Sequence, residues 1–263
     1  MKKKSIILIL IIVLVIVALV IVFLLKGKSL NTESPTVTDL YSYLGSNNLE
    51  VCSGLATYDV DGANYDSLDN KTRICMAYSL LELDDSSILK IDKTKKNNTC
   101  SVGENITFAT DNYEGDICTV TKVSADSVSK QYEKMYGKPI ESFDEFQYNA
   151  TTICYYEDGY YYCGLSEQYT ATIGNEPHTF RTIKSAKEKD DTITIYDYFV
   201  KIVGNECYTS YNQDEKNGKC TDNYTENMEV DYKFLKKYGT AYKHTFKKDG
   251  DNYHWVKSEL VER

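Results

Sequence analysis

One stretch of the chain, Ile6 to Leu25, has twenty consecutive residues without a charged or polar side chain. Twenty helical residues rise about 30 Å, the thickness of a bilayer's hydrocarbon core, and a helix satisfies its backbone groups internally. A cleavable signal peptide would have a shorter apolar region and a small-residue cleavage site, and neither feature precedes Lys26. The sequence therefore predicts a retained transmembrane anchor with basic flanks over residues 1–28.

The charges beside this apolar run predict its orientation. Three lysines and the α-amine precede the run, and two lysines follow it, so the amino end is expected to stay in the cytoplasm. All eight cysteines lie beyond the run, where an oxidising compartment would let them pair. We expect a single-pass cell-membrane protein with a cytoplasmic N-terminus and an extracytoplasmic C-terminal domain.

Beyond the anchor, the sequence predicts a polar linker over residues 29–36 and an α+β domain over 37–263, with two subdomains, about 37–140 and 141–263, as an alternative. This part carries 25 basic and 39 acidic residues, a net charge of about −14. Nucleic acid is an unsuitable partner for such an acidic surface. With 24 tyrosines and only 3 prolines, the segment has enough large side chains to build a core.

The pattern of apolar residues predicts helices before strands. Helices are expected at 37–44, from Ser67 to about residue 81, from Ser124 to Tyr136, and at 228–238. Extended structure with a hairpin turn at Asp61-Gly62 is expected over 55–66. Strands are expected at 146–156, 160–172, 179–186, 192–203, 241–247 and 252–261. Helices packed on an antiparallel sheet follow from this order.

The eight cysteines are interpreted as four disulfides, because zinc sites need close cysteine pairs and these are far apart. Eight cysteines allow 105 pairings, of which sequential pairing is the simplest. The disulfide residues are Cys52, Cys75, Cys100, Cys118, Cys154, Cys163, Cys207 and Cys220.

One disulfide follows from hairpin geometry. A type I′ turn at Asp158-Gly159 pairs residues whose numbers sum to 317, which sets Cys154 opposite Cys163 in a non-hydrogen-bonded pair. Such pairs have Cα atoms about 4.5 Å apart, within the range that a disulfide tolerates.

The chain resembles single-pass surface proteins of low-GC bacteria. The similarity lies in Leu40-Tyr41-Ser42-Tyr43-Leu44, in Cys52-x-Gly54-Leu55, in the Lys-x-Tyr-Gly helix end, and in the segments 183–186 and 192–197. These proteins have no established activity that the resemblance could transfer. The external domain also resembles the cystatin/NTF2-like architecture, which implies a concave pocket.

No catalytic, cofactor or metal motif is present in the sequence: Cys-x-x-Cys, His-Glu-x-x-His, Gly-x-Ser-x-Gly, phosphate-binding loops and EF-hands are all missing. No cofactor, metal site or catalytic residue is predicted.

The C-terminal hairpin decides whether two of the three histidines meet. A three-residue loop at 248–250 would set His244 opposite His254, whereas a two-residue turn at 249–250 sets His244 opposite Trp255. Register follows the hydrophobic pattern, so the two-residue turn is preferred and the histidines are separated.

Tyrosine supplies the candidate contact surface. An apolar ring with a polar tip suits glycan, peptide or protein contact. The predicted ligand-binding residues are Tyr155, Tyr156, Tyr161 and Tyr162. We expect a membrane-anchored binding protein for a protein, glycan or small molecule; the alternatives are a surface hydrolase with paired carboxylates or a structural envelope component.

Overall fold

The structure is a computed structural model that describes residues 27–45, 52, 57–92, 99–110, 116–167, 178–204, 206–210, 216–220 and 230–262. It confirms an α+β fold with antiparallel sheets and four disulfides. The predicted anchor over residues 1–28 lies almost entirely outside the described residues. No helix in the described part of the chain has the length and apolar character needed to cross a membrane.

The helices are α2 (Pro35–Ser42), α3 (Asn70–Tyr78), α4 (Ala125–Tyr136), α5 (Tyr232–Tyr238) and the 3₁₀ turn η2 (Asp85–Ser87). The strands are β1 (Lys28–Leu30), β2 (Ala63–Asn64), β3 (Ile88–Asp92), β4 (Thr99–Val102), β5 (Ile106–Ala109), β6 (Ile117–Ser124), β7 (Phe146–Gln147), β8 (Thr152–Glu157), β9 (Tyr160–Leu165), β10 (His178–Lys189), β11 (Thr192–Val203), β12 (Glu206–Tyr208), β13 (Lys216–Lys219), β14 (Thr240–Asp249) and β15 (Asn252–Glu262).

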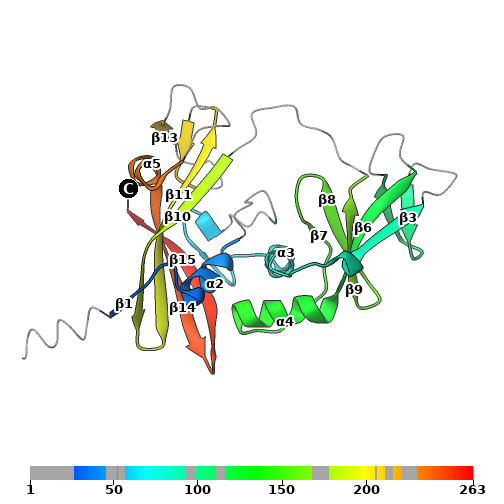
Figure 1. The fold of residues 1–263 in the computed structure, drawn as a ribbon, viewed down its shortest axis with the longest axis horizontal. Helices are drawn as coiled ribbons and strands as arrows, with labels where there is room; N and C mark the ends of the chain where they lie inside the picture. Colours follow the sequence, from blue (N-terminus) through cyan, green and yellow to red (C-terminus); the bar gives the residue numbers. More distant parts are fainter. Residues whose placement is uncertain are drawn as a thin grey trace, which may run out of the picture.

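The described strands form two main sheets, which stand apart in Figure 1. The large sheet has the order β1-β10-β11-β14-β15-β2, with β12 and β13 added beside β11. The small sheet has the order β3-β6-β9-β8-β7, and β4 and β5 form a separate ribbon. The predicted single sheet is therefore corrected to two sheets, because four strands between residues 88 and 124 were not expected.

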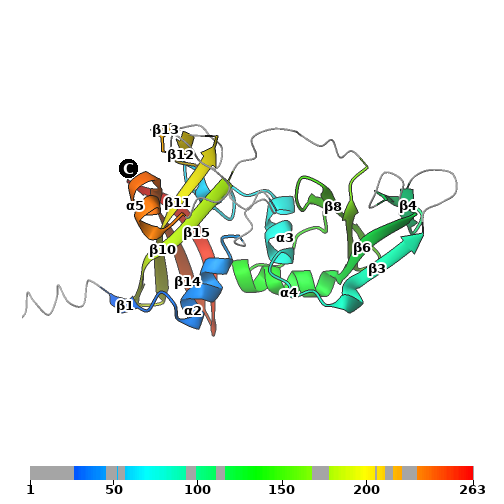
Figure 2. The same cartoon turned by 45° about the horizontal axis from the view of Figure 1, so that its top comes forward.

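The division between the sheets does not coincide with the alternative boundary near residue 140. The small sheet takes its strands from residues 88–165, and the large sheet takes its strands from 28–64 and 178–262. The helices α3 and α4 join the two sheets (Figure 2). One continuous core contains side chains from both, including Val128 and Met135 of α4, Tyr161 of the small sheet, and Phe246 of the large sheet.

The segment expected to be a polar linker, 29–36, is part of the fold. Strand β1 pairs with the edge of β10, so that Lys28 lies opposite Glu188 and Leu30 opposite Ala186. Helix α2 begins at Pro35, five residues after the strand ends. The chain is thus attached to the large sheet from residue 28 onward.

The expectations for helices depend on local capping signals. Helix α4 is confirmed, with Ser124 accepting from the Asp126 backbone and Gly137 in the left-handed conformation at its end. Helix α3 is capped by Asp69 rather than by Ser67, and it starts three residues later than predicted.

The turn at Asp61-Gly62 leads into β2, which pairs with β15 instead of closing a hairpin within 57–66.

All four disulfides join cysteines that are consecutive in the sequence, as predicted: Cys52–Cys75, Cys100–Cys118, Cys154–Cys163 and Cys207–Cys220. The 154–163 hairpin has the predicted register, and both turn residues have positive φ, 49° at Asp158 and 82° at Gly159. The Cα atoms of Cys154 and Cys163 are 4.0 Å apart.

The C-terminal hairpin has neither of the registers considered from the sequence. Its turn residues are Gly250 and Asp251, and only Gly250 has positive φ, the pattern of a type II′ turn. Phe246 pairs with Trp255, after which a bulge at residue 256 shifts the register by one. The histidines are separated as predicted, but through a different pairing: His244 lies opposite Ser258 and His254 opposite Lys247.

Replacing both Cys154 and Cys163 by Ala removes a bridge between residues nine apart in sequence. The loop-entropy model predicts a loss of about 2.7 kcal/mol in the free energy of unfolding. Denaturant unfolding of the full chain, followed by the emission of its single tryptophan, measures this loss. Removing the Cys100–Cys118 pair is the control and should cost at least as much; a loss below about 0.5 kcal/mol for the 154–163 pair would contradict the assignment.

Candidate functional site

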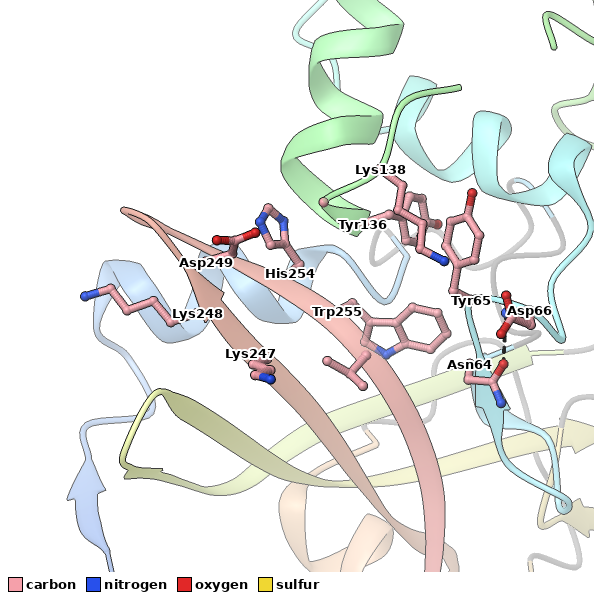
Figure 3. A pocket seen from close by; sticks show the side chains of 12 residues that line it. Asn64, Tyr65, Asp66, Tyr136, Lys138, Lys247, Lys248, Asp249, His254 and Trp255 are labelled. Carbon is pink, nitrogen blue, oxygen red and sulfur yellow. Dashed lines mark hydrogen bonds between the residues drawn. The ribbon is translucent and has the colours of Figure 1, made fainter. Parts of the chain in front are cut away.

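A pocket of about 670 Å³ lies between the end of α4, the 64–66 turn and the β14–β15 hairpin (Figure 3). Its volume is in the range of small-molecule sites. The residues that line it are Asn64, Tyr65, Asp66, Tyr136, Gly137, Lys138, Lys247, Lys248, Asp249, His254, Trp255 and Val256. None of them belongs to the tyrosine group predicted from the sequence.

Three aromatic side chains give the pocket an apolar wall. The ring of Tyr136 makes edge contacts with Tyr65 and with Trp255, at centroid distances of 5.6 and 6.2 Å. Tyr136 and Trp255 are buried, and Tyr65 is half-buried. Trp255 is the only tryptophan in the chain. Its fluorescence therefore reports on the wall of this pocket in the folded protein.

The charged groups in the pocket are mostly positive, although the whole chain has a net charge of −9. Three lysines line it against two aspartates, and Lys247 and Lys248, as neighbours on one strand, point to opposite faces of the hairpin. Nζ of Lys138 lies 3.8 Å from the centroid of the Tyr65 ring, and none of the three lysines forms an ion pair with a described residue. Figure 3 places Asp249 beside His254 at one end and Asp66 beside Asn64 at the other.

His254 attaches the hairpin to the end of α4. Its Nδ1 lies 2.9 Å from the carbonyl oxygen of Lys134, and because a carbonyl only accepts, Nδ1 carries the proton. The ring packs so closely on Gly137 that a Cβ there would lie 2.9 Å from Cδ2 of His254. Gly137 also has a φ of +65°, so glycine meets two requirements at this position.

A Ser-His-Asp arrangement lies beside the pocket but inside the core. His244 Nδ1 is 2.7 Å from Ser258 Oγ, and His244 Nε2 is 3.0 Å from Asp197 Oδ1. Ser258 Oγ also accepts from Nε1 of Trp255 at 3.2 Å. Because an ionised carboxylate only accepts, Nε2 is the protonated nitrogen of His244.

The second oxygen of Asp197 accepts from two tyrosines. Tyr41 and Tyr58 donate to Oδ2 at 2.7 and 2.6 Å, and Arg181 donates to the Tyr58 hydroxyl at 3.2 Å. Burial, reinforced by the charge of Asp197, raises the pKa of both tyrosines well above its usual range. They therefore keep their hydroxyl protons, and remain donors, above the pH at which an exposed tyrosine ionises. We call Tyr41, Tyr58, Arg181, Asp197, His244, Trp255 and Ser258 the Asp197 network.

The burial of Asp197, His244 and Ser258 indicates that the Ser-His-Asp arrangement stabilises the fold rather than catalyses a reaction. Asp197, His244 and Ser258 have exposed fractions of 0, 0 and 1%. The hydroxyl of Ser258 is already engaged by Trp255 and His244, so no substrate carbonyl has access to it. Among the described residues, no cluster of His, Cys, Asp or Glu side chains could hold a metal ion.

The four predicted tyrosines lie on opposite faces of the small sheet. Tyr156 pairs with Tyr161, and Tyr155 pairs with Tyr162, and adjacent pairs along a strand point to opposite sides. Tyr161 is fully buried, and Tyr155 and Tyr162 pack against the core beneath the β4–β5 ribbon. These four residues therefore do not form one contact surface.

Tyr156 alone among the four is well exposed. Its ring stacks on Phe143 at a centroid distance of 4.7 Å, and the two are 38 and 39% exposed. The pocket residues were missed because positions 64–66, 136–138 and 247–256 are brought together by the pairing of β2 with β15 and by the packing of α4 on β15. The adjacent lysines at 247 and 248 and the single tryptophan were the available signal.

Comparisons of the chain with protein-family models, with curated proteins and with solved structures find no match.

Replacing Ser258 by Ala leaves Trp255 Nε1 and His244 Nδ1 without their partner in the core. The expected loss in the free energy of unfolding is about 1–3 kcal/mol. Ser101→Ala, at an exposed strand position, is the matched control and should change stability by less than about 0.5 kcal/mol.

The reactivity of Ser258 tests whether the Ser-His-Asp arrangement has a structural or a catalytic role. The folded wild-type chain should not react with a serine-directed fluorophosphonate. Covalent labelling of Ser258, found by peptide mass analysis, would contradict the structural assignment.

Proposed function

We propose that the chain is a membrane-anchored, extracytoplasmic binding protein and that its ligand occupies the pocket between α4 and the β14–β15 hairpin. The observation that carries this proposal is the lining of the pocket, which combines three lysines with an aromatic wall in an acidic protein. Such a lining suits an anionic ligand that also has an apolar part.

The proposed location rests on the sequence and the disulfides. The apolar run from Ile6 to Leu25 and its basic flank support a single-pass anchor with the N-terminus in the cytoplasm. Four disulfides among the described cysteines support an oxidising environment for the domain.

Binding is favoured over hydrolysis by the positions of the acidic groups. A paired-carboxylate mechanism needs two carboxyl groups on either side of one bond. Asp66 and Asp249 instead lie at opposite ends of the pocket, beside Asn64 and His254 (Figure 3). The buried position of Ser258 likewise gives no support to an acyl-transfer enzyme.

The triple variant Lys138→Ala, Lys247→Ala, Lys248→Ala tests the ligand site. The full chain in non-ionic detergent is titrated with glycerol phosphate, citrate and a neutral disaccharide while Trp255 emission is recorded. We expect the two anions to change the emission and the sugar not to. Since charged hydrogen bonds contribute about 1.5–3 kcal/mol each, the triple variant should bind the anions at least tenfold more weakly.

The matched control is Lys233→Ala, Lys236→Ala, Lys237→Ala on α5, which removes the same charge at the other end of the large sheet. It should bind like the wild type. An equal response to the sugar, or equal weakening in both variants, would contradict the proposal.

A further inference from the structure

The chain joins the large sheet immediately after the predicted anchor. Only Lys26 and Gly27 separate Leu25 from strand β1. The chain is already against β10 at Gly27, where a Cβ would lie 2.8 Å from the carbonyl oxygen of Glu188. The connection from the predicted anchor to the large sheet is therefore only two residues long, which restricts the position of the sheet relative to the bilayer.

The strand registers show which end of the large sheet is nearest the anchor. Cross-strand partners form one continuous row from β1 to β15: Lys28, Glu188, Ile193, Phe246 and Trp255. Strands are spaced by about 4.8 Å, so Trp255 lies about 19 Å along this row from the point where the chain joins the sheet. The pocket is thus level with the start of β1.

The pocket lysines on the hairpin lie on the anchor side of this row. Strand β14 runs from Phe246 toward its turn, so Lys247 and Lys248 extend beyond the row in the direction from which β1 arrives. Three residues of extended chain span about 10 Å, close to the depth of one interfacial layer of a bilayer. An anchor that continues in the direction of β1 would bring the two lysines to the level of the headgroups.

Positive charge at this end of the sheet lies both in the pocket and on β1 and β10, where Lys28, Lys187 and Lys189 are exposed. The turns of the β10–β11 and β14–β15 hairpins carry aspartates at 190, 191, 249 and 251. Three lysines near the pocket are neutralised: Lys134 pairs with Asp39, and Lys243 and Lys257 both pair with Glu259. The pocket lysines differ from the other surface lysines because they adjoin an aromatic wall, which favours capture of a single headgroup there.

The end of α4 does not prevent an anion from binding. Carbonyl groups at a helix C-terminus repel negative charge. The carbonyl of Lys134 is occupied by His254, and Lys138 follows the helix directly. The aromatic wall beside these groups offers an apolar surface to the glycerol and upper acyl parts of a lipid.

We propose that the pocket binds the phosphate-bearing headgroup of an anionic phospholipid in the membrane that holds the chain. This inference rests on the proposed anchor and on the proposed ligand site. It assigns the ligand class by charge and by position, since an anchor that continues in the direction of β1 would bring the pocket to headgroup level. The bound lipid would also fix the domain against the membrane.

The test uses the full chain in phosphatidylcholine nanodiscs, with Trp255 emission as the readout. Addition of phosphatidylglycerol should change the emission saturably, at least tenfold more effectively per mole than glycerol phosphate in solution. The Lys138, Lys247, Lys248 triple alanine variant should lose the response, and the Lys233, Lys236, Lys237 variant should keep it. An equal response to added phosphatidylcholine would overturn the inference.

Failure of this inference is distinguishable from failure of the proposed function. If glycerol phosphate matches phosphatidylglycerol, the ligand site stands and the lipid source is overturned. If no anion changes the emission, both are overturned.

A second arm tests the position of the pocket without any anionic lipid. Nitroxide on the headgroups of phosphatidylcholine should quench Trp255 in the wild-type chain. Insertion of fifteen Gly and Ser residues between Lys26 and Gly27 gives about 20 Å of freedom and should reduce the quenching at least twofold. Equal quenching with and without the insertion would overturn the placement at the membrane.

Discussion

The buried carboxylate of Asp197 is the group on which the arrangement of the large sheet depends. A charge with no exposed surface is tolerated only when its oxygens are fully hydrogen-bonded. Asp197 takes its donors from α2 through Tyr41, from the 57–58 segment through Tyr58, and from β14 through His244. The helix, the loop and the strands are therefore restricted to positions that bring these donors to one carboxylate.

The same network determines the shape of β15 and with it the wall of the pocket. Trp255 and Ser258 are three residues apart, so in a regular strand they would point to opposite faces. The bulge at residue 256 turns both toward the core, where Trp255 donates to Ser258. Val256 is left 39% exposed at the rim of the pocket. The hydrogen bonds that the buried polar groups require thereby shape the wall of the pocket beside them.

Features that depend on nearby residues could be predicted from the sequence. The Cys154–Cys163 bridge follows from an Asp-Gly turn within ten residues, and α4 follows from Ser124 and Gly137 at its ends. The strands between 88 and 124 were missed because apolar residues on their outer face disturb the alternation: Ile88 and Ile117 are 44 and 43% exposed.

Features that depend on distant partners could not be predicted. The register of the β14–β15 hairpin is coupled to Asp197, which lies 47 residues before His244. The pocket forms when α4 packs on β15, and their contacts include the hydrogen bond from His254 to Lys134, 120 residues apart. Local patterns gave the histidine separation correctly, although the turn at Gly250-Asp251 that produces it is not the one expected.

The C-terminal hairpin is held at two histidines, by the core at His244 and by α4 at His254. A long-range ¹H–¹⁵N spectrum of the imidazole groups tests this most directly, since the chain has only three histidines. The hydrogen bonds predict opposite tautomers, with the proton on Nε2 in His244 and on Nδ1 in His254. The same tautomer in both rings, or rapid exchange between tautomers in either, would contradict it.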